Sequence, residues 1–280
     1  MSIPKAISST VVLAVILAAC VPGLVAQDPL LGWKASGNVS DLALIRVAES
    51  KYRTTLTFRN ISGRAISAVA ISFYGRENSA TSRYEEWIGD DQAGLANGNS
   101  FDLDIGNEEA AEYNHMLAIS AVVFEDGTVE GLRHQLDFIR FGRLGKMLET
   151  ERIKSLLAGP KEQYLADEGI KILTDRVGRS PRTHDDALAS VEKTLPPEVS
   201  ILELKSAEEG IRQSFFQGVQ NTRIDMLKRI DQMRQLPLSA KDPKVLTRDL
   251  FLSSLIQKYE TRCTRYRSMW ERAQRGKRHD

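Results

Sequence analysis

The spacing of hydrophobic residues changes once along the chain, close to the dipeptide Asp126-Gly127. Before this point apolar and polar side chains alternate, which is the period of a β-strand. After Gly131 the apolar period is about 3.6 residues, which is the period of an α-helix. We therefore predict an α+β protein in two parts, with a β domain over residues 27–131 and an all-α region over residues 132–280.

The β part contains about six segments with strand-like alternation. The predicted strands cover residues 41–47, 52–59, 66–73, 87–88, 101–105 and 117–124. The last of these is apolar on both faces, which is typical of a central strand covered by a second layer. Its two predicted faces are Leu117, Ile119, Ala121 and Val123 on one side, and Ala118, Val122 and Phe124 on the other. Asp126-Gly127 predicts a hairpin turn, and strands of this length favour a two-sheet antiparallel sandwich.

Two stretches of the β part carry a family resemblance. They are Thr-Leu-Thr-Phe-Arg-Asn-Ile-Ser-Gly-Arg-Ala-Ile-Ser-Ala-Val (55–69) and Ala-Val-Val-Phe-Glu-Asp-Gly-Thr-Val-Glu-Gly (121–131). Both resemble strand pairs of immunoglobulin-like domains in exported bacterial proteins. The resemblance implies an antiparallel immunoglobulin-like β-sandwich. It concerns architecture alone, because the cysteine pair of antibody domains does not occur here.

The first half of the helical region carries three helical patterns. Apolar positions from Leu132 to Leu156 predict one or two helices that stop at Gly159-Pro160. A second pattern covers residues 164–177. Thr183 and Asp186 have the spacing of a capping box, which predicts a short helix from there to residue 194.

Two longer apolar stripes follow in the second half. The first is Ile211, Phe215, Val219, Thr222, Met226, Ile230 and Met233, and the second is Leu252, Ile256, Tyr259, Cys263, Tyr266 and Trp270. Asp242 has the features of an N-cap for the second helix, with Pro243 at its first position. The stripes predict a long antiparallel helical hairpin over about residues 206–275, packed as a coiled coil. Such a hairpin packs on the remaining helices or presents its stripe to a second copy of the chain, which would give a homo-oligomer.

Residues 1–26 have the features of a signal peptide. Lys5 precedes an apolar run from Thr10 to Val21, Pro22-Gly23 breaks the helix, and cleavage is expected after Ala26. A competing interpretation is that Leu17-Ala-Ala-Cys20 resembles the lipobox of bacterial lipoproteins, in which Cys20 is acylated. Both interpretations predict export, to the periplasm or the medium.

The net charge of +1 hides a segregation of charge along the chain. Thirteen Asp and Glu residues stand against Arg83 between residues 77 and 130, whereas eight basic residues stand against three acids between residues 258 and 280. For an exported chain we expect no nucleic acid partner for this basic end. Its anionic partners would be lipid headgroups, phosphate-bearing envelope polymers or the acidic β part itself. The alternative is a solvated helix end whose cations complement the helix dipole.

Motifs for catalysis or metal binding are weak. Ser190-Val-Glu-Lys193 matches Ser-x-x-Lys without its companion motifs. His184-Asp185-Asp186 is similar to the His-Asp pair of metal phosphohydrolases, which would also need a residue such as His134. Residues 102–108 resemble a calcium loop, but Gly106 stands where an oxygen ligand is required. Cys263 lies on an apolar stripe and is interpreted as a small buried hydrophobe, with pairing between molecules as the alternative.

No catalytic, cofactor-binding or metal-binding residue is therefore assigned. The sequence favours an exported, non-enzymatic binding or interaction module of the bacterial cell envelope, whose partner is an unknown protein or an envelope polymer. The alternative is a cell-envelope hydrolase with a site that no motif reveals. That alternative requires a cleft where His115, His134 or His184 meets carboxylates.

Overall fold

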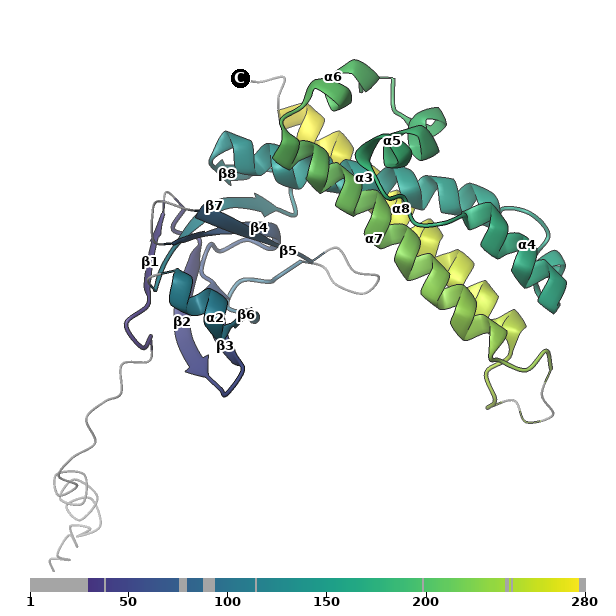
Figure 1. Ribbon diagram of the computed structural model, residues 1–280, viewed down its shortest axis with the longest axis horizontal. Helices are drawn as coiled ribbons and strands as arrows, with labels where there is room; N and C mark the ends of the chain where they lie inside the picture. Colours follow the sequence, from purple (N-terminus) through teal and green to yellow (C-terminus); the bar gives the residue numbers. More distant parts are fainter. Residues whose placement is uncertain are drawn as a thin grey trace, which may run out of the picture.

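The computed structural model describes residues 30–37, 39–75, 80–87, 94–113, 115–197, 199–239, 242 and 244–276. The predicted signal peptide with Cys20, as well as Ile88, Pro243 and His279, lies outside the described residues. The described chain has a sheet-rich N-terminal part and a helical C-terminal part (Figure 1). This confirms the α+β division. Among the described residues, no helix combines the length and hydropathy needed to cross a membrane.

The strands of the N-terminal part form two sheets. The strands are β1 (Lys34–Gly37), β2 (Leu42–Glu49), β3 (Arg53–Asn60), β4 (Ile66–Tyr74), β5 (Ala80–Glu86), β6 (Ser100–Gly106), β7 (Met116–Phe124) and β8 (Val129–Gly131). Sheet A has the order β1-β7-β4-β5, with β8 also paired to β7, and sheet B has the order β2-β3-β6. All neighbours are antiparallel except β1 and β7, which run parallel, so sheet A is mixed.

The two sheets enclose one apolar core. The strand alternation predicted from the sequence places Leu56 and Phe58 of β3 on the inner face of sheet B, where both are completely buried. Val69, Ile71 and Phe73 of β4 face them from sheet A, as the sequence predicted. Burial of these side chains from water is the main stabilisation of the N-terminal part.

Three segments of the N-terminal part depart from the prediction. Strand β1 was not predicted, and its parallel pairing with β7 departs from the expected antiparallel arrangement. A short helix, α2 (Asn107–Glu112), lies between β6 and β7, where no helix was expected. The strand predicted at residues 87–88 is misplaced, because β5 ends at Glu86 and Trp87 follows it. The reason is that β5 reads Ala-Thr-Ser-Arg-Tyr-Glu-Glu. An edge strand of polar residues carries no apolar alternation by which it can be recognised.

The predicted faces of β7 are also wrong, because β7 contains a bulge. Ala70 of β4 pairs with Ala121, but its neighbour Ile71 pairs with Ile119, which leaves Ser120 as an extra residue. One extra residue inverts the alternation that follows it. Leu117 and Ile119 therefore share the core between the sheets with Val122 and Phe124, whereas Ala121 and Val123 face the helices.

The turn between β7 and β8 confirms the predicted hairpin. Gly127 has a φ angle of +92°, which glycine adopts without steric cost. Asp126 contributes through its side chain, because its Oδ1 accepts hydrogen bonds from the backbone nitrogen (2.8 Å) and the hydroxyl (2.6 Å) of Thr128.

The C-terminal part contains six α-helices and two short 3-10 helices within the described residues. They are α3 (Arg133–Leu157), η2 (Lys161–Tyr164), α4 (Asp167–Val177), α5 (His184–Val191), η3 (Glu192–Thr194), α6 (Ile201–Ser206), α7 (Glu209–Arg234) and α8 (Arg248–Gly276). The capping box at the start of α5 is confirmed, since the hydroxyl of Thr183 accepts from the backbone nitrogen of Asp186 at 3.1 Å.

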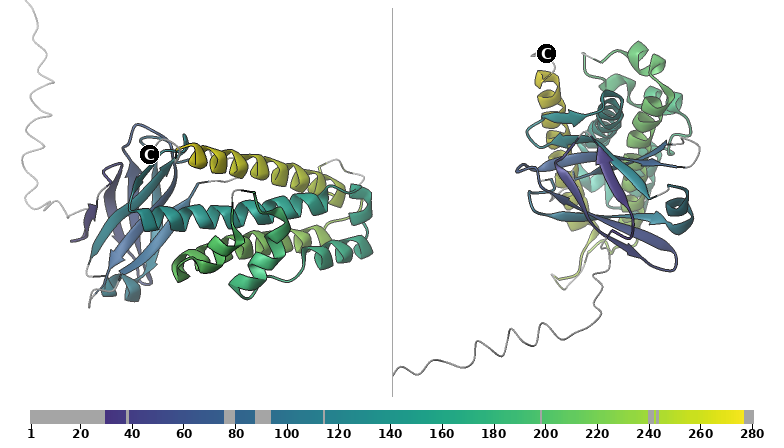
Figure 2. Two further views of the ribbon diagram at one scale, coloured as in Figure 1. Left: turned by 90° about the horizontal axis from the view of Figure 1, so that it is seen from above. Right: turned by 90° about the vertical axis from the view of Figure 1, so that its left-hand side faces the viewer.

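Helix α3 is the common packing partner of the two long helices that the apolar stripes predicted. In Figure 2 (left) α3 lies between α7 and α8, and both pack mainly on α3 rather than on each other. One core joins Leu144 of α3 to Val219 and Trp270, and a second joins Ile153 of α3 to Ile230. The predicted two-helix coiled coil is therefore wrong, because the apolar stripes of α7 and α8 are buried mainly against α3 and not against each other.

Helix α8 begins six residues after the predicted N-cap. Asp242 caps a turn instead, with its Oδ1 accepting from the backbone nitrogen of Lys244 at 2.9 Å. The start of α8 is fixed by Arg248, which is 8% exposed and donates to the carbonyl oxygens of Arg234 (2.9 Å) and Leu236 (2.9 Å). These bonds satisfy carbonyls left free at the end of α7 and tie the two helix ends together.

Candidate functional site at the junction of sheet and helices

The outer face of sheet A is covered by the first half of α3. Ala68 and Ala70 of β4 and Ala121 of β7 are completely buried there, with Ile139 of α3 packed against them. Because alanine side chains are small, the helix can lie close to the sheet. This contact places the polar side chains at the rim of the sheet next to those of α3 and α8.

The inner cluster of this junction is centred on Glu86, at the end of β5. Its side chain is only 5% exposed. Arg143 of α3 donates from Nε to Glu86 Oε1 at 2.7 Å, Lys146 of α3 pairs with Oε2, and the Tyr84 hydroxyl donates to Oε2 at 2.9 Å. Arg143 also donates to the hydroxyl of Ser67 at 2.9 Å. The cluster thus ties β4 and β5 to α3.

Burial and pairing act in opposite directions on these charges. Burial alone would raise the pKa of Glu86, but Lys146 and Arg143 outweigh it and hold that pKa below the ordinary value. Burial alone would lower the pKa of Lys146, but Glu86 raises it above the ordinary value. Both groups are therefore charged near neutral pH, and the cluster is a partly buried ion-pair network.

An outer contact joins the β7–β8 turn to α8. Arg265 Nη2 lies 3.2 Å from Glu125 Oε1, and Arg272 donates to the backbone carbonyl of Glu125. The turn reaches α8 because Gly127 has no side chain, since a Cβ there would stand 2.7 Å from Cβ of Arg272. Both arginines are half-buried.

Charge is segregated across this junction. The acids of these pairs, Glu86 of β5 and Glu125 of the β7–β8 turn, come from the N-terminal part, and the bases come from α3 and α8. Arginines of the basic C-terminal helix therefore contact the acidic β part, which is one of the anionic partners considered from the sequence. Two further bases of α8 pair within the helical part, Arg262 with Asp225 at 2.8 Å and Arg267 with Glu151 at 2.6 Å.

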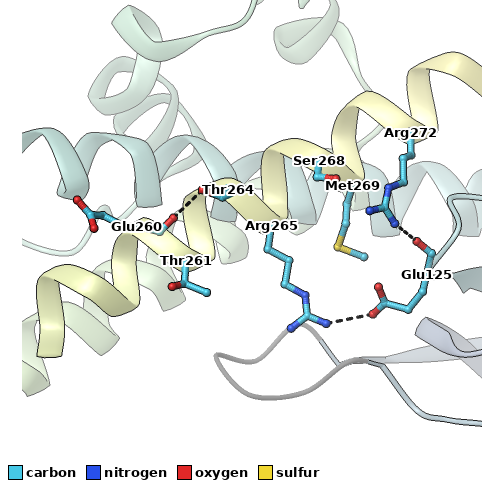
Figure 3. A pocket seen from close by; sticks show the side chains of 8 residues that line it. All are labelled: Glu125, Glu260, Thr261, Thr264, Arg265, Ser268, Met269 and Arg272. Atoms are coloured by element: carbon cyan, nitrogen blue, oxygen red, sulfur yellow. Dashed lines mark hydrogen bonds and ion pairs between the residues drawn. The ribbon is translucent and has the colours of Figure 1, made fainter.

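A groove opens beside the outer contact, with a volume of about 530 Å³ (Figure 3). We call it the junction groove. It is lined by two acids, two arginines and three hydroxyl residues of α8 and of the turn, together with Met269: Glu125, Glu260, Arg265, Arg272, Thr261, Thr264 and Ser268. The two guanidinium groups suit oxyanions, because guanidinium forks match phosphate and carboxylate. The hydroxyls of Thr261 and Thr264 donate within α8 to the carbonyls of Gln257 and Glu260, so toward a polyol they act as acceptors.

The histidines considered for a hydrolytic site lie in separate elements. His115 precedes β7 and packs against Trp33 at 5.2 Å between ring centroids. His134 lies in the first turn of α3, and His184 opens α5. His184 Nδ1 is 3.6 Å from Asp185, whose side chain is 88% exposed. Among the residues placed by the structure, no three His, Cys, Asp or Glu side chains are grouped to hold a metal ion.

Ser190, Asp102 and Asp104, the other candidates from the sequence, make hydrogen bonds within the fold. The Ser190 hydroxyl donates to the carbonyl of Ala187 (2.7 Å) and accepts from Arg223 (2.8 Å). Asp102 and Asp104 are exposed on β6 and accept from threonine hydroxyls of β3 at 2.7 and 2.6 Å. Both aspartates are therefore solvent-facing strand positions.

Cys263 is buried, as the sequence predicted, and forms no disulfide within the described chain. It borders a second cavity of about 290 Å³ between α3 and α8. Burial and then the nearby Glu151 carboxylate raise the pKa of the thiol. A raised pKa reduces the thiolate fraction, so Cys263 is poorly suited to act as a nucleophile.

The residues that build the junction groove were not singled out from the sequence. The available signal was the segregation of charge, which indicated attraction between the two parts but no particular pair. Comparison of the chain with protein-family models, with curated proteins and with solved structures found no match.

Proposed function

We propose that the protein is an exported, non-enzymatic binding module of the bacterial cell envelope and that the junction groove holds its ligand, an anionic polymer. The observation that carries this proposal is the pair of half-buried arginines, Arg265 and Arg272, in a groove lined with hydroxyls. The binding module is proposed ahead of the hydrolase alternative because His115, His134 and His184 lie in separate elements and no group of three His, Cys, Asp or Glu side chains occurs among the described residues.

The fold in this proposal is an immunoglobulin-like sandwich followed by a helical bundle. It is supported by the single core between the two sheets. It is also supported by the path of the chain, which crosses from one sheet to the other after β1, after β3, after β5 and after β6. Repeated crossing is typical of antiparallel sandwiches with Greek-key connections.

The module is proposed to act as a monomer. The apolar stripes of α7 and α8 are buried against α3, so a dimer through the hairpin would first have to expose them. Gel filtration with light scattering tests this proposal. A dimer mass at high micromolar concentration would contradict it.

Export is supported by the composition of residues 1–26. The two proposed maturation routes, cleavage after Ala26 and acylation at Cys20, give different N-terminal peptides. Mass spectrometry of the mature N-terminal peptide distinguishes them, and an intact N-terminus in purified envelope fractions would contradict both.

Binding is tested with mature protein (residues 27–280) and soluble polymers of equal length: polyphosphate, polygalacturonate and neutral dextran. The double variant Arg265→Gln/Arg272→Gln should lose at least tenfold in affinity for the anionic polymer that the wild type binds. The matched control is Arg53→Gln/Arg234→Gln, which removes two exposed cations outside the groove. Equal losses in both double variants, or no binding by the wild type, would refute the groove as the ligand site.

A further inference from the structure

We infer that the ligand group of the junction groove is a phosphate carried by a soluble polymer, and that the carboxylate of Glu125 occupies its place when no ligand is bound. This inference rests on the proposed function and gives the ligand class and its internal competitor. Two acids line the described groove, Glu125 of the β7–β8 turn and Glu260 of α8, and it is Glu125 that pairs with Arg265 (Figure 3).

The geometry of the contact between Arg265 and Glu125 allows a ligand to replace the Glu125 carboxylate. The two side chains are 22% and 25% exposed, so solvent reaches both. Their separation of 3.2 Å exceeds the roughly 2.7–2.9 Å of strong charge-assisted hydrogen bonds. An oxyanion that approaches from solvent can adopt a better distance to the guanidinium than a carboxylate tethered to the turn.

The arrangement of donors favours phosphate over carboxylate. Arg265 and Arg272 lie two turns apart on α8 with Ser268 between them, and all three line the groove. Carboxylate oxygens lie in one plane, whereas phosphate oxygens point in tetrahedral directions and can accept from donors on different sides at once. Threonine hydroxyls at residues 261 and 264 extend the wall and suit the hydroxyls of a sugar or glycerol unit.

The shape of the groove favours a flexible polymer over a bilayer. The groove is recessed between a turn and a helix, and its one apolar lining residue, Met269, is 7% exposed. Membrane-surface binding uses exposed apolar side chains that enter the interface. A chain with phosphate groups can enter such a recess, whereas a flat bilayer meets its rim.

The experiment measures affinity by fluorescence polarisation with a labelled oligomer of glycerol phosphate. The variant Glu125→Gln removes the competing charge, and its affinity should rise about three- to fivefold, the size of a partly exposed ion pair. The matched control Asp231→Asn, from an exposed pair with Arg234 at the far end of the bundle, should leave affinity unchanged. Glu125→Ala provides a second test should the glutamine variant unfold, and thermal unfolding is recorded for every variant.

The outcomes separate this inference from the proposed function. An affinity of Glu125→Gln at or below that of wild type would overturn the competitor role, although binding through the arginines would stand. Equal affinity for polygalacturonate would overturn the choice of phosphate. Binding confined to phosphatidylglycerol vesicles, with none to the oligomer, would overturn the soluble source. Retained binding in Arg265→Gln/Arg272→Gln would overturn the proposed site itself.

Discussion

Gly145 of α3 lies so close to Phe215 of α7 that a Cβ on the glycine would stand 2.3 Å from the phenylalanine carbonyl oxygen. Across the same contact, a Cβ on Gly218 of α7 would stand 2.3 Å from the carbonyl oxygen of Gly142. Glycines on both helices therefore allow backbones to touch where any side chain would hold them apart. This close approach explains why α7 pairs with α3.

Replacing Gly145 with alanine should lower the free energy of unfolding by about 1–3 kcal/mol, because the helices must separate to admit the methyl group. Urea unfolding followed by circular dichroism measures this. The control is Gly210→Ala in α7, where no atom lies within 4 Å of an added Cβ. It should be neutral or stabilise by up to about 1 kcal/mol, since alanine is the better helix former. Similar changes in unfolding free energy at both positions would show that helix propensity determines the effect, and not the contact between α3 and α7.

The buried carboxylate of Glu149 fastens α7 to α3 a turn further along. Arg223 donates to both of its oxygens at 2.8 Å, and Arg152 donates to both at 2.7 and 2.9 Å. Arg223 also reaches the carbonyl of Arg179 (3.1 Å) and the hydroxyl of Ser190. Each carboxylate oxygen thus accepts two hydrogen bonds, and the Glu149 side chain is completely buried.

Glu149→Gln should destabilise the fold by about 3–5 kcal/mol, because it leaves two guanidinium groups without their buried counter-ion. Thermal and urea unfolding measure the loss. The control Glu209→Gln removes the partner of Arg212 from an exposed pair within α7, and should change stability by less than about 1 kcal/mol. A loss below about 1 kcal/mol for Glu149→Gln would mean that the network contributes no net stability.

The capping box of α5 gives a test of a feature visible in sequence. Thr183→Ala removes the acceptor of the Asp186 backbone nitrogen and should cost about 1 kcal/mol. Ser155→Ala is the control, because that exposed hydroxyl donates within α3 to the carbonyl of Glu151 and caps no helix end. Hydrogen exchange of the α5 amides should quicken in the threonine variant alone. Unchanged exchange there would show that packing, and not the cap, orders this helix.

Local rules predicted those elements whose residues carry their own signal. The alternation in β3 and β4, the glycine at 127 and the capping box at Thr183 each specify a local conformation. Elements with no local signal were missed. The polar edge strand β5 has no alternation, and the extra residue at Ser120 is visible only once its partner strand is known.

The partners of surfaces could not be predicted, because an apolar stripe shows that a face is buried without showing what covers it. The stripes of α7 and α8 therefore suggested a coiled coil, whereas α3 covers both. The junction groove was missed for the same reason, because its two sides come from distant segments of the chain. Glu125 and Arg265 stand 140 residues apart, and only the charges of the two segments, not their pairing, could be predicted from sequence.

The inner cluster makes a prediction for the dependence of stability on pH. The pKa of Glu86 in the folded state is held below its ordinary value of 4.5 by Lys146 and Arg143. A carboxylate whose pKa is lowered by folding stabilises the native state above its unfolded pKa. It loses that contribution as pH falls through the folded pKa. The raised pKa of Lys146 sets the opposite limit, because its contribution is lost only as pH rises through a value above 10.5.

Glu86→Gln should therefore destabilise the protein by roughly 3 kcal/mol near pH 7, since two bases lose a partly buried partner. The difference between wild type and variant should stay constant down to about pH 5. It should shrink below the ordinary glutamate value, where the carboxylate of the unfolded chain takes up a proton before that of the folded chain. Urea unfolding at about pH 7, 5, 4 and 3 measures the difference directly. A difference that persists unchanged to about pH 3 would show that Glu86 acts through packing, because protonation leaves packing intact and removes only the charge.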